Sequence, residues 1–235
     1  MILWAGTSNN DVGMVVEHHP RVILPKRKQE IQSVPGRSGD IILYQDAYEN
    51  YEQSYPVFID GRSRGSLYKV LPKISDWLLG HSGYQRLEDS YFPDVYRMAY
   101  YTGGAEFISI LKEYGEGTLT FNCAPEKFYK IGERSISISN GQIITNPSLF
   151  PAKPLITVKG SGSGVLKFGS NQLSISAIGG TLMIDIRDHK AYSGSTNKNS
   201  VITGRYENMV LKGKTTISWT GGITSVSLVP RWWTL

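Results

Sequence analysis

The sequence has little cysteine, little charge and no long hydrophobic run. Its 235 residues include one cysteine, Cys123, so no disulfide can form within a single chain. No stretch reaches the roughly 18 consecutive apolar residues that a membrane-spanning helix needs. The first 16 residues lack the basic start and long apolar core of a secretory signal. We therefore expect a protein that is made and folded in a cytoplasm and does not insert into a membrane.

The usual signatures of catalysis and of metal or cofactor binding are also missing. The four histidines are scattered, and neither an HExxH nor a CxxC pattern occurs. The run Gly160–Gly164 has glycine where a nucleophile elbow needs serine, and there is no Walker phosphate loop. Asp185 and Asp188 are separated by an odd number of positions, so on a strand they would point to opposite faces. We predict no catalytic residue, no metal site and no cofactor: the protein is not expected to be an enzyme.

What the sequence does contain is typical of a mainly β protein with two domains. Hydrophobic residues make up 40% and aromatic residues 11%, enough for a sizeable core, and 25 glycines and 11 prolines punctuate short β-branched runs. Residues 1–133 carry 14 Lys and Arg against 17 Asp and Glu, a net charge of −3. Residues 134–235 carry 11 against 3, a net charge of +8. This change predicts a domain boundary near Glu133.

The first domain is predicted to be α+β with one main helix. Leu67, Val70, Leu71, Ile74 and Leu78 recur at helical spacing, Pro72 suits a first helical turn and Gly80 a helix end. Strands are predicted at Tyr91–Tyr101, Glu106–Tyr114 and Gly117–Ala124. The cluster Lys26–Lys28 is interpreted as a solvated turn. The tyrosine-rich stretch from Val34 to Tyr55 is interpreted as a long hairpin or arm.

The second domain is predicted to be a β-sandwich or jelly roll. Ser135–Ser139 alternates strictly and is followed by Asn140-Gly141 and Ile143–Thr145, a pattern typical of a β-hairpin. Further short strands follow at regular spacing, and the Gly160–Gly164 run between two of them is interpreted as a hairpin loop. Trp219, Trp232 and Trp233 could stack on sugars, fill a core or form an interface, and we favour core or interface.

Several local patterns, in this order, resemble one family. They are Val34-Pro-Gly-Arg-Ser-Gly-Asp40, Ile74-Ser-Asp-Trp-Leu-Leu79, Gly117–Tyr129, Ile184-Asp185 followed by Ala191-Tyr192, Gly204-Arg-Tyr206, and Pro230-Arg-Trp-Trp233. Together they are similar to the distal tail proteins, or Dit proteins, of siphophages. The resemblance implies a ring-forming domain over 1–133, which 230–235 is a candidate to complete, and a galectin-like or carbohydrate-binding-module-like sandwich over 134–229.

The same resemblance implies a structural role in the virion, at the distal end of the tail. Its implied partners are five further copies in a hexameric ring, with ring stacking left open, the major tail tube protein, and tail-tip or receptor-binding proteins. DNA would pass through the channel only in transit, and a net-acidic ring domain would favour sliding. The alternative function is binding of host cell-wall carbohydrate.

Two groups of residues are candidates for assembly contacts. Tyr44, Tyr48, Tyr51 and Tyr55 are the candidate oligomer interface, because tyrosines are frequent in protein interfaces. Arg231, Trp232 and Trp233 are candidates for docking between the domains. Adjacent side chains in an extended segment point to opposite faces, so the two tryptophans need two partners. We expect the first domain to supply one of them.

Overall fold

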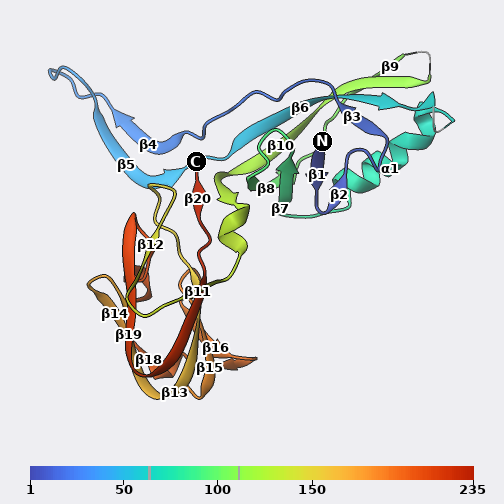
Figure 1. The fold of residues 1–235 in the computed structure, drawn as a ribbon. Helices are drawn as coiled ribbons and strands as arrows, with labels where there is room; N and C mark the ends of the chain where they lie inside the picture. Colours follow the sequence, from blue (N-terminus) through green and yellow to red (C-terminus); the bar gives the residue numbers. More distant parts are fainter. Residues whose placement is uncertain (63–64, 111) are drawn as a thin grey trace. The chain divides into compact units, whose positions relative to one another are not determined.

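The computed structural model describes residues 1–62, 65–110 and 112–235, which form two units. The first comprises residues 1–127 together with Leu235, and the second comprises residues 128–234. The change in net charge predicted a boundary after Glu133, six residues later. The chain is mainly β, with one α-helix among the described residues, as predicted (Figure 1).

A twisted antiparallel sheet forms the body of the first unit. Its strands are β1 (Ile2–Trp4), β2 (Thr7–Ser8), β3 (Met14–Val16), β6 (Tyr51–Asp60), β7 (Gln85–Asp89), β8 (Val95–Tyr101), β9 (Phe107–Ile110) and β10 (Tyr114–Tyr129). They lie in the order β2-β1-β7-β8-β10-β6-β3, and β9 and the terminal strand β20 (Trp233–Thr234) also pair with β10. The predicted strand Glu106–Tyr114 includes Leu111, which lies outside the described residues. Its described parts form β9 and the start of β10.

The core of this unit lies between one face of the sheet and helix α1 (Leu67–Leu79). Residues of β6 alternate between buried and more exposed positions, and the buried ones, such as Val57 and Ile59, share a cluster with the buried side of the helix. The indole Nε1 of Trp77 donates to the carbonyl of Trp4 at 3.3 Å. Trp77 is therefore a core residue.

The ends of α1 follow from local hydrogen bonding. Ser66 is the N-cap, and its hydroxyl accepts from the backbone N–H of Tyr68 at 3.2 Å. The N–H of Gly80 donates to the carbonyl of Asp76 at the other end. Because the helix starts at Leu67, Pro72 lies in its second turn and not in the predicted first turn, so the helix lacks one internal hydrogen bond there.

A second antiparallel sheet is folded into two layers in the second unit. Its strands are β11 (Ile136–Ile138), β12 (Gln142–Thr145), β13 (Leu155–Phe168), β14 (Asn171–Ile175), β15 (Gly180–Asp185), β16 (Lys190–Ser193), β17 (Thr196–Asn197), β18 (Ile202–Thr203) and β19 (Lys214–Val229). Short 3₁₀ turns η2 (Lys130–Glu133), η3 (Asn199–Val201) and η4 (Tyr206–Asn208) and the terminal β20 (Trp233–Thr234) complete the unit.

Two long strands, β13 and β19, pass through both layers. The first half of β13 pairs with β15 and its second half with β14, while β19 pairs with β12 at its start and β11 at its end. The two strands pair with each other along most of their length, with register shifts around Gly160 and Gly164. The interpretation of Gly160–Gly164 as a hairpin loop is wrong, since this run is a bend within one continuous strand.

Glycine is required at the bend because the two backbones touch there. A Cβ at Gly222 would lie 1.6 Å from the carbonyl oxygen of Ser161, and one at Gly160 would lie 2.1 Å from that of Gly222. No side chain fits at those distances. The glycine-rich segments therefore let β13 and β19 cross from one layer to the other.

The predicted β-hairpin across Asn140-Gly141 is also wrong, although the turn exists. Gly141 has a positive φ of 87°, and the N–H of Gln142 donates to the carbonyl of Ser139. The flanking strands β11 and β12 do not pair with each other. Each pairs with a different half of β19, so the turn links the two layers.

Candidate assembly surface

The feature of the first unit that most resembles a contact surface is a separate two-stranded hairpin. It consists of β4 (Arg27–Gln32) and β5 (Ile41–Tyr48), and these two strands pair with no other described strand. At the tip the N–H of Arg37 donates to the carbonyl of Val34 at 3.1 Å. The arm predicted over Val34–Tyr55 thus exists, but it begins earlier and ends earlier than predicted.

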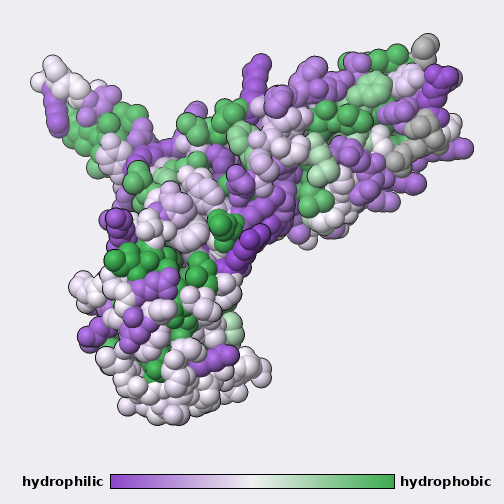
Figure 2. Space-filling model, in the orientation of Figure 1, coloured by the Kyte–Doolittle hydropathy of each residue, from purple (hydrophilic) through white to green (hydrophobic). Residues whose placement is uncertain are grey.

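One face of this hairpin is apolar, aromatic and basic. Ile31 lies directly opposite Ile42, and the guanidinium of Arg27 lies 5.8 Å from the ring centre of Tyr44 and 5.4 Å from that of Tyr48. These five residues are called the hairpin face below. Ile31 and Tyr44 are 56% and 59% exposed, and Figure 2 shows hydrophobic residues along the hairpin in green. An isolated two-stranded hairpin is only marginally stable in water, so packing of this face against another surface would stabilise it.

The four predicted interface tyrosines divide into two pairs. Tyr44 and Tyr48 lie on the hairpin face, where an interface role stays a prediction. Tyr51 and Tyr55 are 6% and 0% exposed and point into the core from β6. The period of two in β6 sends both of them inward, so the predicted interface reduces to Tyr44 and Tyr48.

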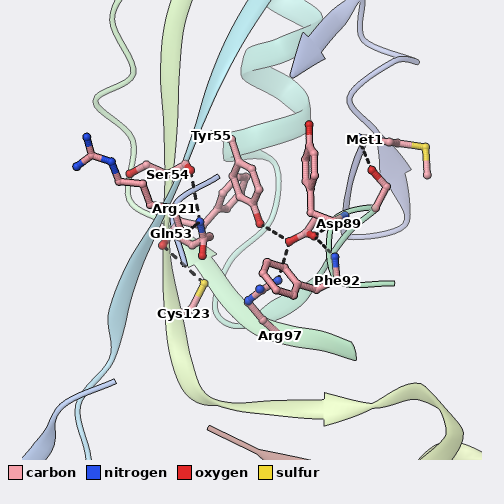
Figure 3. A network of polar contacts seen from close by, with 12 residues as sticks. Met1, Arg21, Gln53, Ser54, Tyr55, Asp89, Phe92, Arg97 and Cys123 are labelled. Atoms are coloured by element: carbon pink, nitrogen blue, oxygen red, sulfur yellow. Dashed lines mark hydrogen bonds and ion pairs between the residues drawn. The ribbon is translucent and has the colours of Figure 1, made fainter. Parts of the chain in front are cut away.

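Tyr51 and Tyr55 belong to a buried polar network that joins β6, β7 and β8 (Figure 3). The Asp89 carboxylate accepts hydrogen bonds from the Tyr55 hydroxyl at 2.9 Å and from Arg97 Nη1 at 2.7 Å. Arg97 Nε donates to the Tyr51 hydroxyl at 3.1 Å, and the other Asp89 oxygen accepts from the backbone N–H of Phe92. Each charge is paired, as burial requires. The network therefore fixes the start of β6, into which the hairpin leads.

Burial also keeps the reactive groups of this region protonated. It raises the pKa of Tyr51 to about 12, that of the Cys123 thiol to about 12, and that of Tyr55 well above its ordinary value. A neutral buried thiol is a poor nucleophile. Cys123 is therefore a buried, unreactive cysteine, and the polar network around it has a structural role.

The two tryptophans of the C-terminal segment have side-chain partners inside the second unit, while the backbone of β20 pairs with β10. Trp232 is part of that unit's core, and its carbonyl accepts from the N–H of Tyr129 at 3.0 Å. Trp233 stacks on Phe150 with ring centres 4.6 Å apart. Both tryptophan side chains thus have partners in one unit, and two domains are not needed to bury them. Docking of this segment against the first unit stays a prediction.

Arg231 and Asp185 form an ion pair in the second unit. Arg231 donates to both carboxylate oxygens of Asp185, and Asp185 also accepts from the backbone N–H of Arg187. Burial opposes ionisation of Asp185, but these hydrogen bonds and the charge of Arg231 outweigh it and hold the pKa of Asp185 below its usual value. The carboxylate is engaged by Arg231 and does not form an acid–base pair with Asp188.

Sequence reasoning missed Arg27 and Ile31 as members of a surface. Lys26–Lys28 was interpreted as a solvated turn, whereas Arg27 and Lys28 begin β4. The signal that could have found them is the period of two through Arg27, Gln29 and Ile31, followed by the turn-rich stretch after Val34.

The described residues lack two features, a membrane-spanning helix and a metal-binding cluster. No helix in the described part of the chain is long and apolar enough to cross a membrane. Within the same residues, His, Cys, Asp and Glu side chains do not gather in any group of three or more that could hold a metal ion.

The chain is similar to known proteins in its three-dimensional structure but not detectably in its sequence. No family model matches the sequence, and no curated protein sequence matches it. The crystal structure of the SPP1 Dit protein, described as a paradigm of the hub adsorption apparatus in phages that infect Gram-positive bacteria, has a TM-score of 0.77 at 15% identity. That match covers 100% of this chain and 98% of the SPP1 chain. The phage P2 baseplate matches with a TM-score of 0.46 at 11% identity, over 92% of this chain and 89% of that one. The resemblance to distal tail proteins is confirmed at the level of the fold.

Proposed function

We propose that the protein is a structural subunit of a siphophage tail, a distal tail hub whose copies form a hexameric ring. The observation that carries this proposal is the shared fold with the SPP1 Dit protein over 100% of this chain and 98% of that one. A shared fold alone does not define a function. The second support is therefore the hairpin face, because a ring subunit needs a surface for self-association.

In this proposal residues 1–133 form the ring, and the hairpin reaches the neighbouring copy. Tyr44 and Tyr48 supply aromatic contact area at the interface, and burying them together with Ile31 and Ile42 removes apolar surface from water. The segment 230–235 is proposed to dock against the first unit. The sandwich, 134–229, is an accessory domain that is not needed for ring closure.

The ring would connect the tail tube protein on one side with tail-tip or receptor-binding proteins on the other, in the virion. DNA would pass through its central channel. The net charge of −3 in residues 1–133 supports this, since few phosphate contacts would hold the DNA during passage.

The alternative, a free-standing carbohydrate-binding protein, has less support. Trp219 and Trp232 are each 9% exposed, and Trp233 already stacks on Phe150. Little of the second unit's tryptophan surface is left for a sugar ring. The alternative predicts a chain that stays monomeric at all concentrations and sediments with host cell walls.

Light scattering after size-exclusion chromatography tests the proposal. The wild-type protein is expected to elute at the mass of six 26.1 kDa chains. A variant in which residues 29–44 are replaced by Asn-Gly, a good two-residue hairpin loop, is expected to be monomeric with an unchanged melting temperature. A monomeric wild type rejects the proposal, and a ring that survives the replacement rejects the role of the hairpin.

A further inference from the structure

One layer of the second unit has an outward face on which hydroxyl groups gather. This layer consists of β12, β14, β18, the second half of β13 and the first half of β19. Its strands alternate between buried and solvent-facing residues, so every second side chain points away from the core. The strand registers place Thr220, Val165, Ser174 and Thr203 in one row across this face.

Two lysines lie on the same face. Lys167 follows Val165 by two residues on β13 and lies opposite Ser218 of β19, and Lys214 precedes Ser218 by four residues. Four residues correspond to about 13 Å along a strand. Both lysines are exposed, and neither forms an ion pair with a described residue. The lysine–hydroxyl face is defined here by Lys167, Lys214, Ser174, Thr203, Ser218 and Thr220.

A hollow of about 320 Å³ lies at one end of this face. Ser174, Thr203 and Thr220 contribute their side chains to its lining, and Gly164 and Gly221 contribute only backbone. The three hydroxyl groups make no hydrogen bond to another described residue. Because a hydroxyl both donates and accepts, they can form hydrogen bonds with a hydroxylated ligand.

The lysine–hydroxyl face is free of acidic residues. Strands β12, β13, β14, β18 and β19 contain no Asp or Glu. Asp185 and Asp188 lie at the connection between β15 and β16 in the other layer, and Glu207 lies 3.8 Å from His189 of that connection. Nothing in these strands therefore opposes the approach of an anion.

The composition of the face favours one class of ligand. Separate cations along a strand suit a chain that carries repeated negative charges, and unpaired hydroxyl groups suit polar units between those charges. The outward positions of these strands hold no aromatic side chain, since Phe168 and Trp219 point into the core. Single-stranded nucleic acids are held by stacking of their bases on aromatic side chains. A flexible polyanion without rings thus fits better than a nucleic acid.

We propose that the lysine–hydroxyl face binds a polyol-phosphate polymer, a chain in which phosphodiester groups alternate with short hydroxylated units. Lys167 and Lys214 each contact a phosphate, and the hollow holds one hydroxylated unit. All of these residues belong to one layer of a single copy, so binding does not depend on ring formation. In a tail hub, a role that rests on the proposed function, the face adds a contact to polymers of the host envelope.

Calorimetric titration of the full chain with a synthetic glycerol-phosphate oligomer tests this face. Lys167→Glu and Lys214→Glu are each expected to raise Kd at least about fivefold, because each variant loses a phosphate contact and gains an anion. Lys159→Glu is the matched control, with the same change of charge on the same strand. Lys159 lies on the other layer, opposite Thr181 of β15. At physiological salt its effect on Kd is expected to be small, since screening limits the range of exposed charges.

A second pair of variants tests the hydroxyl groups. Thr203→Val/Thr220→Val removes two hydroxyls and keeps the β-branched shape of both side chains. It is expected to weaken binding of the glycerol-phosphate oligomer several-fold. Binding of single-stranded DNA with the same number of phosphates should not change, because it depends on charge alone. Lys167→Gln, which is neutral, gives the lysine result if Lys167→Glu lowers the melting temperature.

Three outcomes overturn the proposal. The first is a wild-type chain that does not bind the oligomer even at low salt. The second is an equal loss of affinity in Lys159→Glu and Lys167→Glu, which would assign binding to net charge. The third is single-stranded DNA that binds the wild type as tightly as the oligomer does. Light scattering on the same samples reports ring formation separately, so a chain that binds the oligomer as a monomer supports this site and rejects the ring.

Discussion

Arg231 holds Asp185 with two parallel hydrogen bonds, Nη1 to Oδ1 at 2.7 Å and Nη2 to Oδ2 at 2.8 Å. This paired geometry is the stronger arrangement of an arginine–carboxylate ion pair. It ties the last residues of the chain to the end of β15 within the second unit. Two segments that are far apart in the sequence are thereby joined within the second unit.

The pair gives the second unit a pH-dependent contribution to stability. The folded pKa of Asp185 lies below its ordinary value, so the contribution is present above the unfolded pKa and is lost as the pH falls through the folded pKa. Arg231→Gln is expected to lower the free energy of unfolding by about 1.5–3 kcal/mol at pH 7. The deficit should shrink as the pH falls below about 4, where the carboxyl becomes protonated in the unfolded state. Urea unfolding at pH 7 and pH 3 measures it, with Arg187→Gln as control. An equal deficit at both pH values would contradict this explanation.

The buried network of the first unit should be sensitive to loss of its anion. Asp89→Asn leaves the Arg97 guanidinium buried without a counter-charge, and a loss of about 3–5 kcal/mol in unfolding free energy is expected. The double variant Asp89→Asn/Arg97→Met removes the stranded charge and should be more stable than Asp89→Asn alone. Chemical denaturation of the three proteins checks this. A double variant that is less stable than the single one would show that the pair is not the main interaction at this site.

Backbone contact at the bend of β13 and β19 predicts a large effect from one methyl group. Gly222→Ala places a Cβ against the Ser161 carbonyl and should lower the unfolding free energy of the second unit by several kcal/mol, above the ~1–3 kcal/mol usual for overpacking. Gly162→Ala at the same bend meets nothing within 4 Å and has a φ of 71°. It should cost only about 1 kcal/mol. Similar melting curves for the two variants would exclude the close approach as the cause.

Local sequence pattern predicted the elements better than their pairing. The period of 3.6 identified α1, since every buried residue of the helix lies on one stripe. Asn140-Gly141 correctly predicted a turn. The error lay in the partners, because a local pattern specifies a turn and not which distant strand its flanks will join. Here the Asn140 side chain forms two hydrogen bonds with the backbone of Trp219, at 2.9 and 3.0 Å. These bonds hold the turn between β11 and β12 against β19.

For the candidate surface, too, the sequence predicted some of the residues but not how the strands bring them together. Tyrosine content drew attention to Tyr44 and Tyr48, but also to Tyr51 and Tyr55, whose inward direction depends on where β6 begins. Val15 and Ile108, which lie in one row across the sheet of the first unit, come from strands far apart in sequence. Their adjacency depends on strand order, which composition and spacing do not encode.

Electron microscopy of the purified wild-type protein tests the central claim most directly, because it shows subunit number and arrangement in single particles. The proposed hub predicts closed rings with sixfold symmetry and a central opening, seen at concentrations where light scattering reports six 26.1 kDa chains. Class averages that contain only particles of a single chain across the same concentrations would contradict it.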